Sequence, residues 1–348
     1  MSAPNDERRA FHPARVTIGA IAVLLGLLVA LVAVRLARPT VLPTAPYGEA
    51  ALGPLPAPGG TWDVLVREDA RLRSALPTDA LLSLTDPSQA DDAIALDRAA
   101  VEAAFAELDP AELDSFVPVL DALYDGRPLL DGCRDLIAGC PHIGALRAEQ
   151  RAELLVLSRW LAHDDEGGRA LLVRVLIASE GLARSGRSVN AQLVGLTALG
   201  RAVVLATALA RAGFTLGPEA HAALASVATG EIDLSRGWIA EVLAADQALR
   251  TVGQERLLER LFFDRATAAR LVYESQERCI AYARDPTAPR PPPVTTPSSG
   301  PTAWMVSDTV SMIFVESMLV DCAEPIERAR TLRDDARRRA RALAAIAE

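Results

Sequence analysis

The sequence predicts an all-α protein with a single N-terminal transmembrane helix, followed by a soluble multi-helix bundle of antiparallel helical hairpins. Apolar residues, chiefly Ala and Leu, form 50% of the chain and aromatic residues only 4%. This composition, with few clusters of β-branched residues, favours helices over sheets. Helix-capping patterns recur after residue 62, and the connections between the periodic segments are short.

The anchor is predicted over Val16–Val34, an apolar run without a charged residue. Its nineteen residues span about 28 Å as a helix, close to the ~30 Å hydrocarbon core of a bilayer. Arg8, Arg9 and Arg15 precede the run and two Arg follow it, which favours a short cytoplasmic tail over residues 1–15. A cleaved signal peptide is the main alternative, but its apolar core is usually shorter and the small-residue cleavage pattern is poor here. We therefore expect a single-pass protein of the inner membrane with its body outside the cytoplasm.

A tether is predicted over residues 35–61, which are rich in Pro, Ala and Gly and show no helical period. In polyproline geometry, at ~3.1 Å per residue, it reaches roughly 85 Å from the bilayer if it does not pack back on the body.

The extracytoplasmic helical domain is predicted over residues 62–284. Asp86 and Asp109 each precede a proline and, further on, an acceptor at the third helical position, so both are predicted helix starts. Further helices are expected at about 63–76, 112–124, 148–163, 168–185, 189–212, 218–229, 235–250, 253–262 and 264–284.

The segment Ala191–Ala212 is apolar almost all round, so a second membrane span is an alternative for it. Arg201 at its middle disfavours that alternative, because a central Arg costs ~2.5–3.5 kcal/mol or more in a bilayer. We interpret the segment as the central buried helix of the bundle. Arg201 then needs a buried carboxylate, for which Glu180 is the candidate partner in a structural ion pair.

Residues 285–303 are predicted to form a Pro-rich linker or loop. After it, residues 304–348 are expected to form a C-terminal helical hairpin packed on the same domain, with an Arg-rich surface helix starting at Pro325.

Four cysteines follow the anchor, and an even number outside the cytoplasm indicates disulfides. Of the three connectivities, the pairing of Cys133 with Cys140 and of Cys279 with Cys322 joins the nearest neighbours. Buried free thiols are the alternative, and a zinc site is disfavoured because the Cys133–Cys140 spacing is too wide.

The formal net charge of −9 is uneven: residues 63–135 carry 17 acidic side chains and 6 Arg. This disfavours binding of nucleic acid, which requires a basic face. The acidic stretch is interpreted as a solvated surface, with an acidic docking face for a basic partner as the alternative. All 36 basic residues are Arg, so Lys-based covalent catalysis is excluded for this chain.

Two polar clusters are the candidates for a site. The run from His163 to Glu166 holds side chains of catalytic types, but it is interpreted as the exposed end of a helix stopped by Gly167 and Gly168. Arg184, Arg187 and Asn190 lie at a turn between two apolar helices and form a weak candidate site for an anion. No nucleotide loop, metal spacing or hydrolase motif is present in the sequence, so we predict no catalytic, cofactor or metal residue.

The expected function is a non-catalytic binding or scaffolding module of the bacterial envelope, with a protein partner. Two alternatives stay open: an anchored helical enzyme acting on cell wall or lipid through His163 and carboxylates, and a small-molecule sensor with a pocket between the helix of Trp160 and Ala191–Ala212.

Overall fold

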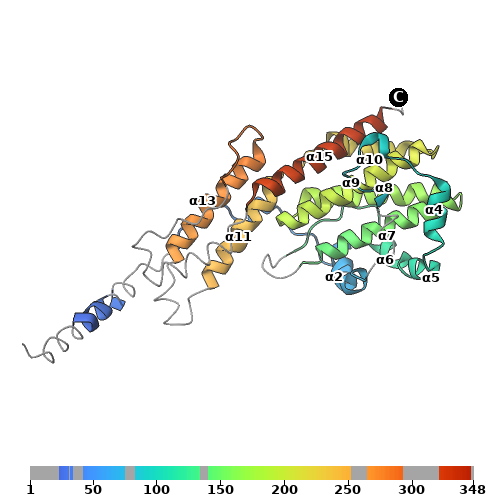
Figure 1. Cartoon of the computed structure of the whole chain (residues 1–348). Helices are drawn as coiled ribbons and strands as arrows, with labels where there is room; N and C mark the ends of the chain where they lie inside the picture. Colours follow the sequence, from blue (N-terminus) through green and yellow to red (C-terminus); the bar gives the residue numbers. More distant parts are fainter. Residues whose placement is uncertain are drawn as a thin grey trace, which may run out of the picture.

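A computed structural model of the chain describes residues 23–30, 32–33, 42–74, 83–133, 140–251, 265–292 and 321–345. Within these ranges the regular structure is entirely helical, as the sequence predicts. The molecule is elongated (Figure 1): a helical bundle fills one end, a two-helix arm extends from it, and the helical residues near the N-terminus lie beyond the arm.

Three long helices form the centre of the bundle, and each packs against the other two. They are α7 (His142–Leu161), α8 (Asp165–Ser185) and α9 (Val189–Arg211). The turns between them are short, so neighbours run antiparallel, as expected for consecutive hairpins. Among the described residues, α9 is the one helix long and apolar enough to cross a membrane, and 78% of its apolar window is buried inside the molecule. Its burial fits the interpretation as the core helix of the bundle.

Shorter helices cover the outer face of α7. The helix α2 (Thr61–Leu72) packs on α7 and on α6 (Val117–Leu123), while α4 (Arg98–Phe105) contacts α7 near its C-terminal end. Asp109 caps α5 (Pro110–Ser115) by accepting a hydrogen bond from the amide of Ala111, which confirms the predicted helix start.

The predicted helix start at Asp86 is wrong. Its carboxylate accepts hydrogen bonds from the Ser88 amide and hydroxyl, 2.8 and 2.7 Å long, which close a turn instead. The chain then passes through η2 (Asp91–Ala93) and an extended stretch before Asp97 caps α4. The same residue types that cap helices also form local turns, and here the short 3-10 helix η2, rather than an α-helix, comes after the turn.

The arm consists of α11 (Ser235–Thr251) and α13 (Arg265–Arg284), which pack on each other. The C-terminal helix α15 (Ala323–Ala344) starts beside α13 and runs along α9 and α10 (Gly217–Thr229), so it joins the arm to the bundle (Figure 1). The helix predicted at 253–262 and the first part of the predicted C-terminal hairpin, 304–320, lie outside the described residues.

Both predicted cysteine pairs stand at disulfide distance. The Cα atoms of Cys133 and Cys140 are 6.0 Å apart, and those of Cys279 and Cys322 are 5.9 Å apart. The second pair ties α13 to the start of α15, across a linker of which residues 293–320 lie outside the described residues.

The end of the predicted tether packs on the body. Leu52 in η1 (Glu49–Leu52) is fully buried, and Leu42, Ala45 and Tyr47 pack against the core. The predicted extended tether therefore does not include residues 42–52, because they pack on the body.

The predicted anchor Val16–Val34 is only partly described. Residues 23–30 and 32–33 are helical, and the side chains from Val23 to Ala30 are all exposed. The rest of the anchor, and residues 1–15 with it, lie outside the described residues.

Candidate functional site

A buried charged cluster joins α7 to α9 in the middle of the bundle. Arg201 of α9 forms ion pairs with Glu149 and Glu153, which stand one turn apart on α7; its Nε is 3.3 Å from the Glu149 Oε2. Both carboxylates are 1% exposed, and Arg201 also donates a 2.6 Å hydrogen bond to the Thr85 hydroxyl. Two acids therefore share one base away from water.

This arrangement favours one bound proton. Burial raises the pKa of Glu149 well above its usual value, and the neighbouring Glu153 raises it further, more than Arg201 lowers it. Neither oxygen of Glu149 accepts a hydrogen bond from a described residue, nor does one oxygen of Glu153. Burial also raises the pKa of the nearby Tyr124, with the two carboxylates adding to the effect. The side chain of Arg201 is 7% exposed and those of both acids are 1% exposed, so the cluster lies away from solvent.

Glu180 is not the partner of Arg201. Its carboxylate lies 2.7 Å from the Nη2 of Arg184, one turn further along α8, and accepts a 3.0 Å hydrogen bond from Ser226. Arg201 does form the expected buried ion pair, but its carboxylates are Glu149 and Glu153 of α7 rather than Glu180 of α8. Proximity in the chain favours the preceding helix, but α9 packs against α7 as well as α8.

The two arginines of the candidate anion site point to different partners. Arg184 is engaged by Glu180, and Arg187 donates to the Gly53 carbonyl at 3.2 Å. Asn190 is exposed in the first turn of α9, whose N-cap is Ser188. The structure therefore does not bring these side chains together around a common point.

His163 ends α7 and is exposed at the surface. Its φ of 59° is left-handed, the conformation that often closes a helix, so His163 takes the place expected for Gly167 and Gly168. Those glycines lie instead in the first turn of α8, which Asp164 caps. The His163 Nε2 lies 3.2 Å from a guanidinium nitrogen of Arg98, which is a cation. Among the described residues, no carboxylate forms a hydrogen bond or ion pair with His163.

A second buried polar group lies beside the Cys133–Cys140 pair. The fully buried Asp131 carboxylate accepts hydrogen bonds from the amides of Arg187, at 2.6 Å, and Cys133, at 2.9 Å. His142 at the start of α7 places its Nε2 3.6 Å from the same carboxylate. These contacts hold the segment at Asp131, just before Cys133, against the end of α8.

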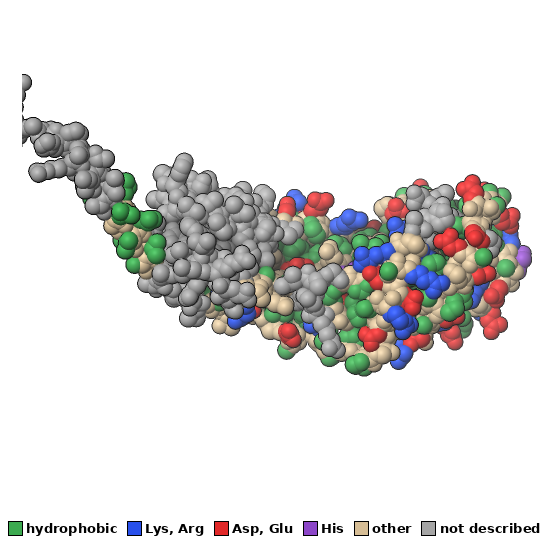
Figure 2. Space-filling model, turned by 90° about the horizontal axis from the view of Figure 1, so that it is seen from below, with side chains coloured by type: hydrophobic (Ala, Val, Ile, Leu, Met, Phe, Trp, Pro, Cys, Tyr) green, Lys and Arg blue, Asp and Glu red, His purple; other side chains and the backbone are tan. Residues whose placement is uncertain are grey.

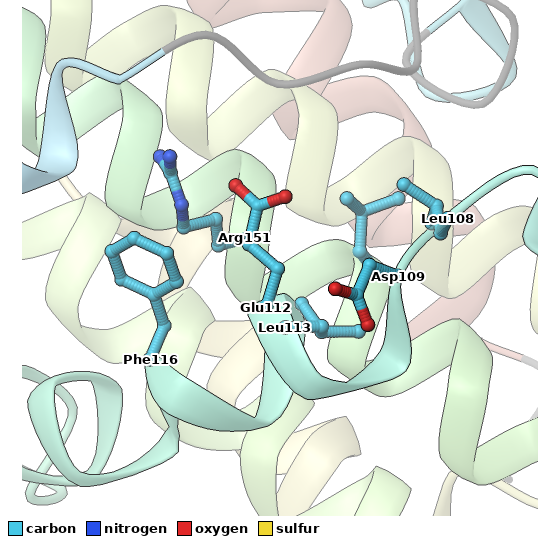
Figure 3. Close-up of a pocket in the computed structure, with 7 residues that line it drawn as sticks. Leu108, Asp109, Glu112, Leu113, Phe116 and Arg151 are labelled. Atoms are coloured by element: carbon cyan, nitrogen blue, oxygen red, sulfur yellow. The ribbon is translucent and has the colours of Figure 1, made fainter.

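A pocket lies on the surface between α5 and α7 (Figure 3). Its apolar wall is formed by Leu108 before α5, Leu113 of α5, Leu154 of α7 and the Phe116 ring. The guanidinium carbons of Arg151 and Arg71 lie over this ring, 4.2 and 4.8 Å from its centre. The full lining is Leu108, Asp109, Glu112, Leu113, Phe116, Arg151 and Leu154.

Arg151 and Glu112, two charged residues of this pocket, differ in the hydrogen bonds that their side chains make. The buried Arg151 guanidinium donates to the carbonyls of Leu72, at 2.8 Å, and Ser74, at 3.1 Å. The Glu112 carboxylate points to the same side of the pocket as Arg151 in Figure 3, and no described residue makes a hydrogen bond or ion pair with it. The exposed Glu112 carboxylate nevertheless acts on the Arg151 guanidinium: it raises the Arg151 pKa, against the larger lowering by burial.

Beyond the arginines at the Phe116 ring, many acidic side chains lie in the stretch from α4 to α6. Acidic side chains gather at the end of the molecule formed by α4 and α5, on the right in Figure 2. The exposed acidic residues of this stretch are Asp97, Glu102, Glu107, Asp109, Glu112, Asp114, Asp121 and Asp125. This end is opposite to the exposed apolar helix near the N-terminus (Figure 1).

Sequence reasoning missed both acids of the buried cluster and the pocket. Glu149 and Glu153 share one stripe of α7 with Leu157 and Trp160, so charged residues in an apolar stripe were the available signal. The pocket had no such signal, because it depends on how the short helix α5 lies against Arg151.

Comparisons with protein-family models, with curated proteins and with solved structures find no match for this chain.

Proposed function

We propose that the chain is a membrane-anchored binding or scaffolding protein of the bacterial envelope, with a helical body held outside the cytoplasm. The observation that carries the proposal is the exposed apolar helix from Val23 to Ala30. Its leucines and valines are 55–65% exposed, whereas the comparable side chains of α9 are buried. A run of large apolar side chains with this exposure is stabilised by another apolar environment, such as a bilayer.

The cysteine pairs support a location outside the cytoplasm. Each pair stands at disulfide distance, and such bonds persist in oxidising compartments such as the periplasm. The Cys133–Cys140 pair closes a loop beside Asp131, and the Cys279–Cys322 pair attaches the C-terminal helix α15 to α13 of the arm. Together they favour a body whose shape changes little.

A binding role is supported by the distal pocket. It lies at the end of the molecule away from the apolar helix, and its Glu112 side chain is exposed. The alternative of an enzyme acting through His163 lacks this support, because His163 is exposed beside Arg98 and does not line the pocket.

The proposal is tested by fusing a phosphatase that is active only in the periplasm, and separately a fluorescent protein that matures only in the cytoplasm, to the C-terminus. We expect phosphatase activity, no fluorescence, and retention of the fusion in the membrane fraction after alkaline carbonate extraction. A matched variant with Leu24→Arg and Leu28→Arg places two charges in the apolar run, and we expect it to lose membrane retention. A fluorescent fusion without phosphatase activity would overturn the proposal.

A further inference from the structure

We propose that residues 85–94 form a strap over α9, which is closed while the buried acids of α7 hold one proton and opens when they lose it. The strap begins at Thr85, whose hydroxyl donates a 3.0 Å hydrogen bond to the Glu153 Oε2 and accepts one from Arg201. Thr85 lies outside the three central helices, so the strap supplies a hydrogen-bonding group to the cluster between α7 and α9. The inference concerns a conformational change of the body and goes beyond the proposed binding function.

The strap lies on α9 with little apolar burial. Ile94 packs on Val204 and Ala208 of α9. Of residues 85–94, Thr85 and Ile94 are buried, whereas the others are half-buried or exposed. Segments with few buried apolar contacts open at a lower free-energy cost than a packed core does. The strap is therefore able to lift while the central helices stay together.

Two arginines hold the strap by its backbone. Arg339 of α15, which is 4% exposed, donates to the Pro87 carbonyl at 2.9 Å and to a carboxylate oxygen of Asp91 at 2.8 Å. Arg211 at the end of α9 donates to the Ile94 carbonyl at 2.8 Å. These contacts involve strap residues after Thr85, so a change at Arg339 weakens the strap without removing a group of the buried cluster.

The charges of the cluster make the strap depend on a proton. When both acids are ionised, Glu149, Glu153 and Arg201 leave one net negative charge away from solvent, and one bound proton removes it. When the strap lifts, water reaches the Thr85 side of the cluster and solvates both ionised acids. The closed strap therefore binds this proton more tightly than the open strap. Opening then becomes more favourable as pH rises, by up to about tenfold per pH unit for one proton.

The other titratable groups at the cluster keep their charge in the neutral range. Glu149 faces Glu153 on its own helix, Arg201 on α9 and Tyr124 after α6. Burial raises the pKa of Tyr124, which therefore stays neutral. Asp86 of the strap acts on Arg201, and hydrogen bonds within its own turn lower the Asp86 pKa, so it stays ionised. Among the described groups, the two buried acids are left to exchange the proton.

The test uses the full chain in nanodiscs with one added cysteine as a reporter of the strap. Ile94 is 1% exposed, so Ile94→Cys reacts with a thiol reagent only when the strap lifts. Ala93→Cys, at the exposed neighbouring position, reacts at the intrinsic rate for each pH, and the chain without an added cysteine gives the background. We expect the ratio of the Ile94→Cys rate to the Ala93→Cys rate to rise by about tenfold or more between pH 6 and pH 8.

Three variants connect this rise to the buried acids. Glu149→Gln keeps the size of the side chain and leaves Glu153 alone with Arg201, so we expect the ratio to change by less than about threefold over the same range. Glu107→Gln removes an exposed carboxylate and is the matched control, which should keep the full rise. Arg339→Ala is expected to raise the ratio at every pH without changing its dependence on pH, and it tests the strap even if Glu149→Gln fails to fold.

A second reporter separates the strap from unfolding of the whole body. Ala178→Cys lies fully buried on α8, and we expect it to react at least about tenfold more slowly than Ile94→Cys at pH 8. A ratio that stays constant with pH, a full rise in Glu149→Gln, or equal rates for Ala178→Cys and Ile94→Cys would each overturn the inference. These outcomes do not depend on which side of the membrane the body lies.

Discussion

The Nε of Arg201 on α9 and the Oε2 of Glu149 on α7 are 3.3 Å apart, between side chains that are 7% and 1% exposed. Glu153 completes the group from the next turn of α7. The two central helices are therefore joined through charges that water does not reach. Breaking such a group by removing one partner leaves the other charges buried and uncompensated, which is more costly than losing a surface ion pair.

The first prediction concerns Arg201→Met. We expect it to lower the free energy of unfolding by about 3–5 kcal/mol, since it leaves two buried carboxylates without their cation. Urea unfolding followed by tryptophan fluorescence measures this change. The control is Arg174→Met, which breaks the exposed pair between Arg174 and Asp121 and should cost below about 1 kcal/mol. Equal losses for the two variants would contradict a buried network.

The second prediction concerns the pH dependence of stability. Burial and Glu153 raise the pKa of Glu149 above its unfolded value, so the folded state holds this proton more tightly than the unfolded state. The stabilisation from this group is present below the unfolded pKa and is lost as pH rises through the folded pKa. Arg201 and Tyr124 face the same carboxylate, and neither needs to titrate in this range.

Glu149→Gln removes that titration while keeping the size of the side chain. We expect the variant to lose less stability than the unaltered protein between pH 5 and pH 8, and to be the more stable of the two at pH 8. Urea midpoints across that pH range measure the difference. An unchanged pH dependence in the variant would show that Glu149 is ionised in both folded and unfolded states.

The third prediction concerns the packed end of the tether. Arg236 donates hydrogen bonds to the carbonyls of Leu52 and Arg184, and Arg187 donates to that of Gly53. We expect Arg236→Ala to raise the amide hydrogen exchange of residues 48–53 by about tenfold or more, because local opening becomes easier when these bonds are lost. Arg67→Ala, at a side chain that is 67% exposed, is the control and should leave that exchange unchanged. No difference between the variants would mean that the hydrogen bonds of Arg236 do not hold this segment.

The fourth prediction compares the two cysteine pairs. If both are oxidised, replacing Cys279 and Cys322 by Ser should destabilise the protein by about 4 kcal/mol, and replacing Cys133 and Cys140 by about 2.5 kcal/mol, since the first pair closes the longer loop. Unfolding midpoints of the two double variants, with and without reductant, measure the order. An equal effect of reductant on every variant would show that the bonds do not form.

The all-α fold and most helices of the body could be predicted because helical periodicity and capping residues are local signals. Asp109 acts as the cap that its sequence context indicates. Asp86 does not, because an aspartate before proline also closes a turn, and the choice depends on whether a helical segment comes next. Ala191–Ala212 could be assigned to the core because Arg201 argues against a span, and the structure places this helix at the centre of the bundle.

Contacts between distant segments could not be predicted in the same way. Glu153 meets Arg201 across 48 positions of the chain, and no local pattern distinguishes it from Glu180 as the partner. Arg184 and Arg187 are close in sequence, yet one turns to a carboxylate of its own helix and the other to the carbonyl of Gly53, 134 positions away. The pocket at Glu112 is likewise formed by tertiary packing, so composition indicated only the acidic character of that end.

The most direct test of the account uses the absence of Lys from the chain. Arg67→Lys and Arg8→Lys each add one reactive side-chain amine, the first at an exposed position of the body and the second before the apolar run. Intact spheroplasts are treated with an amine reagent that does not cross membranes, and labelling is compared with permeabilised cells. The account predicts that the Arg67→Lys variant is labelled in intact spheroplasts and that the added amine of Arg8→Lys is labelled only after permeabilisation. The reverse pattern would contradict a body held outside the cytoplasm.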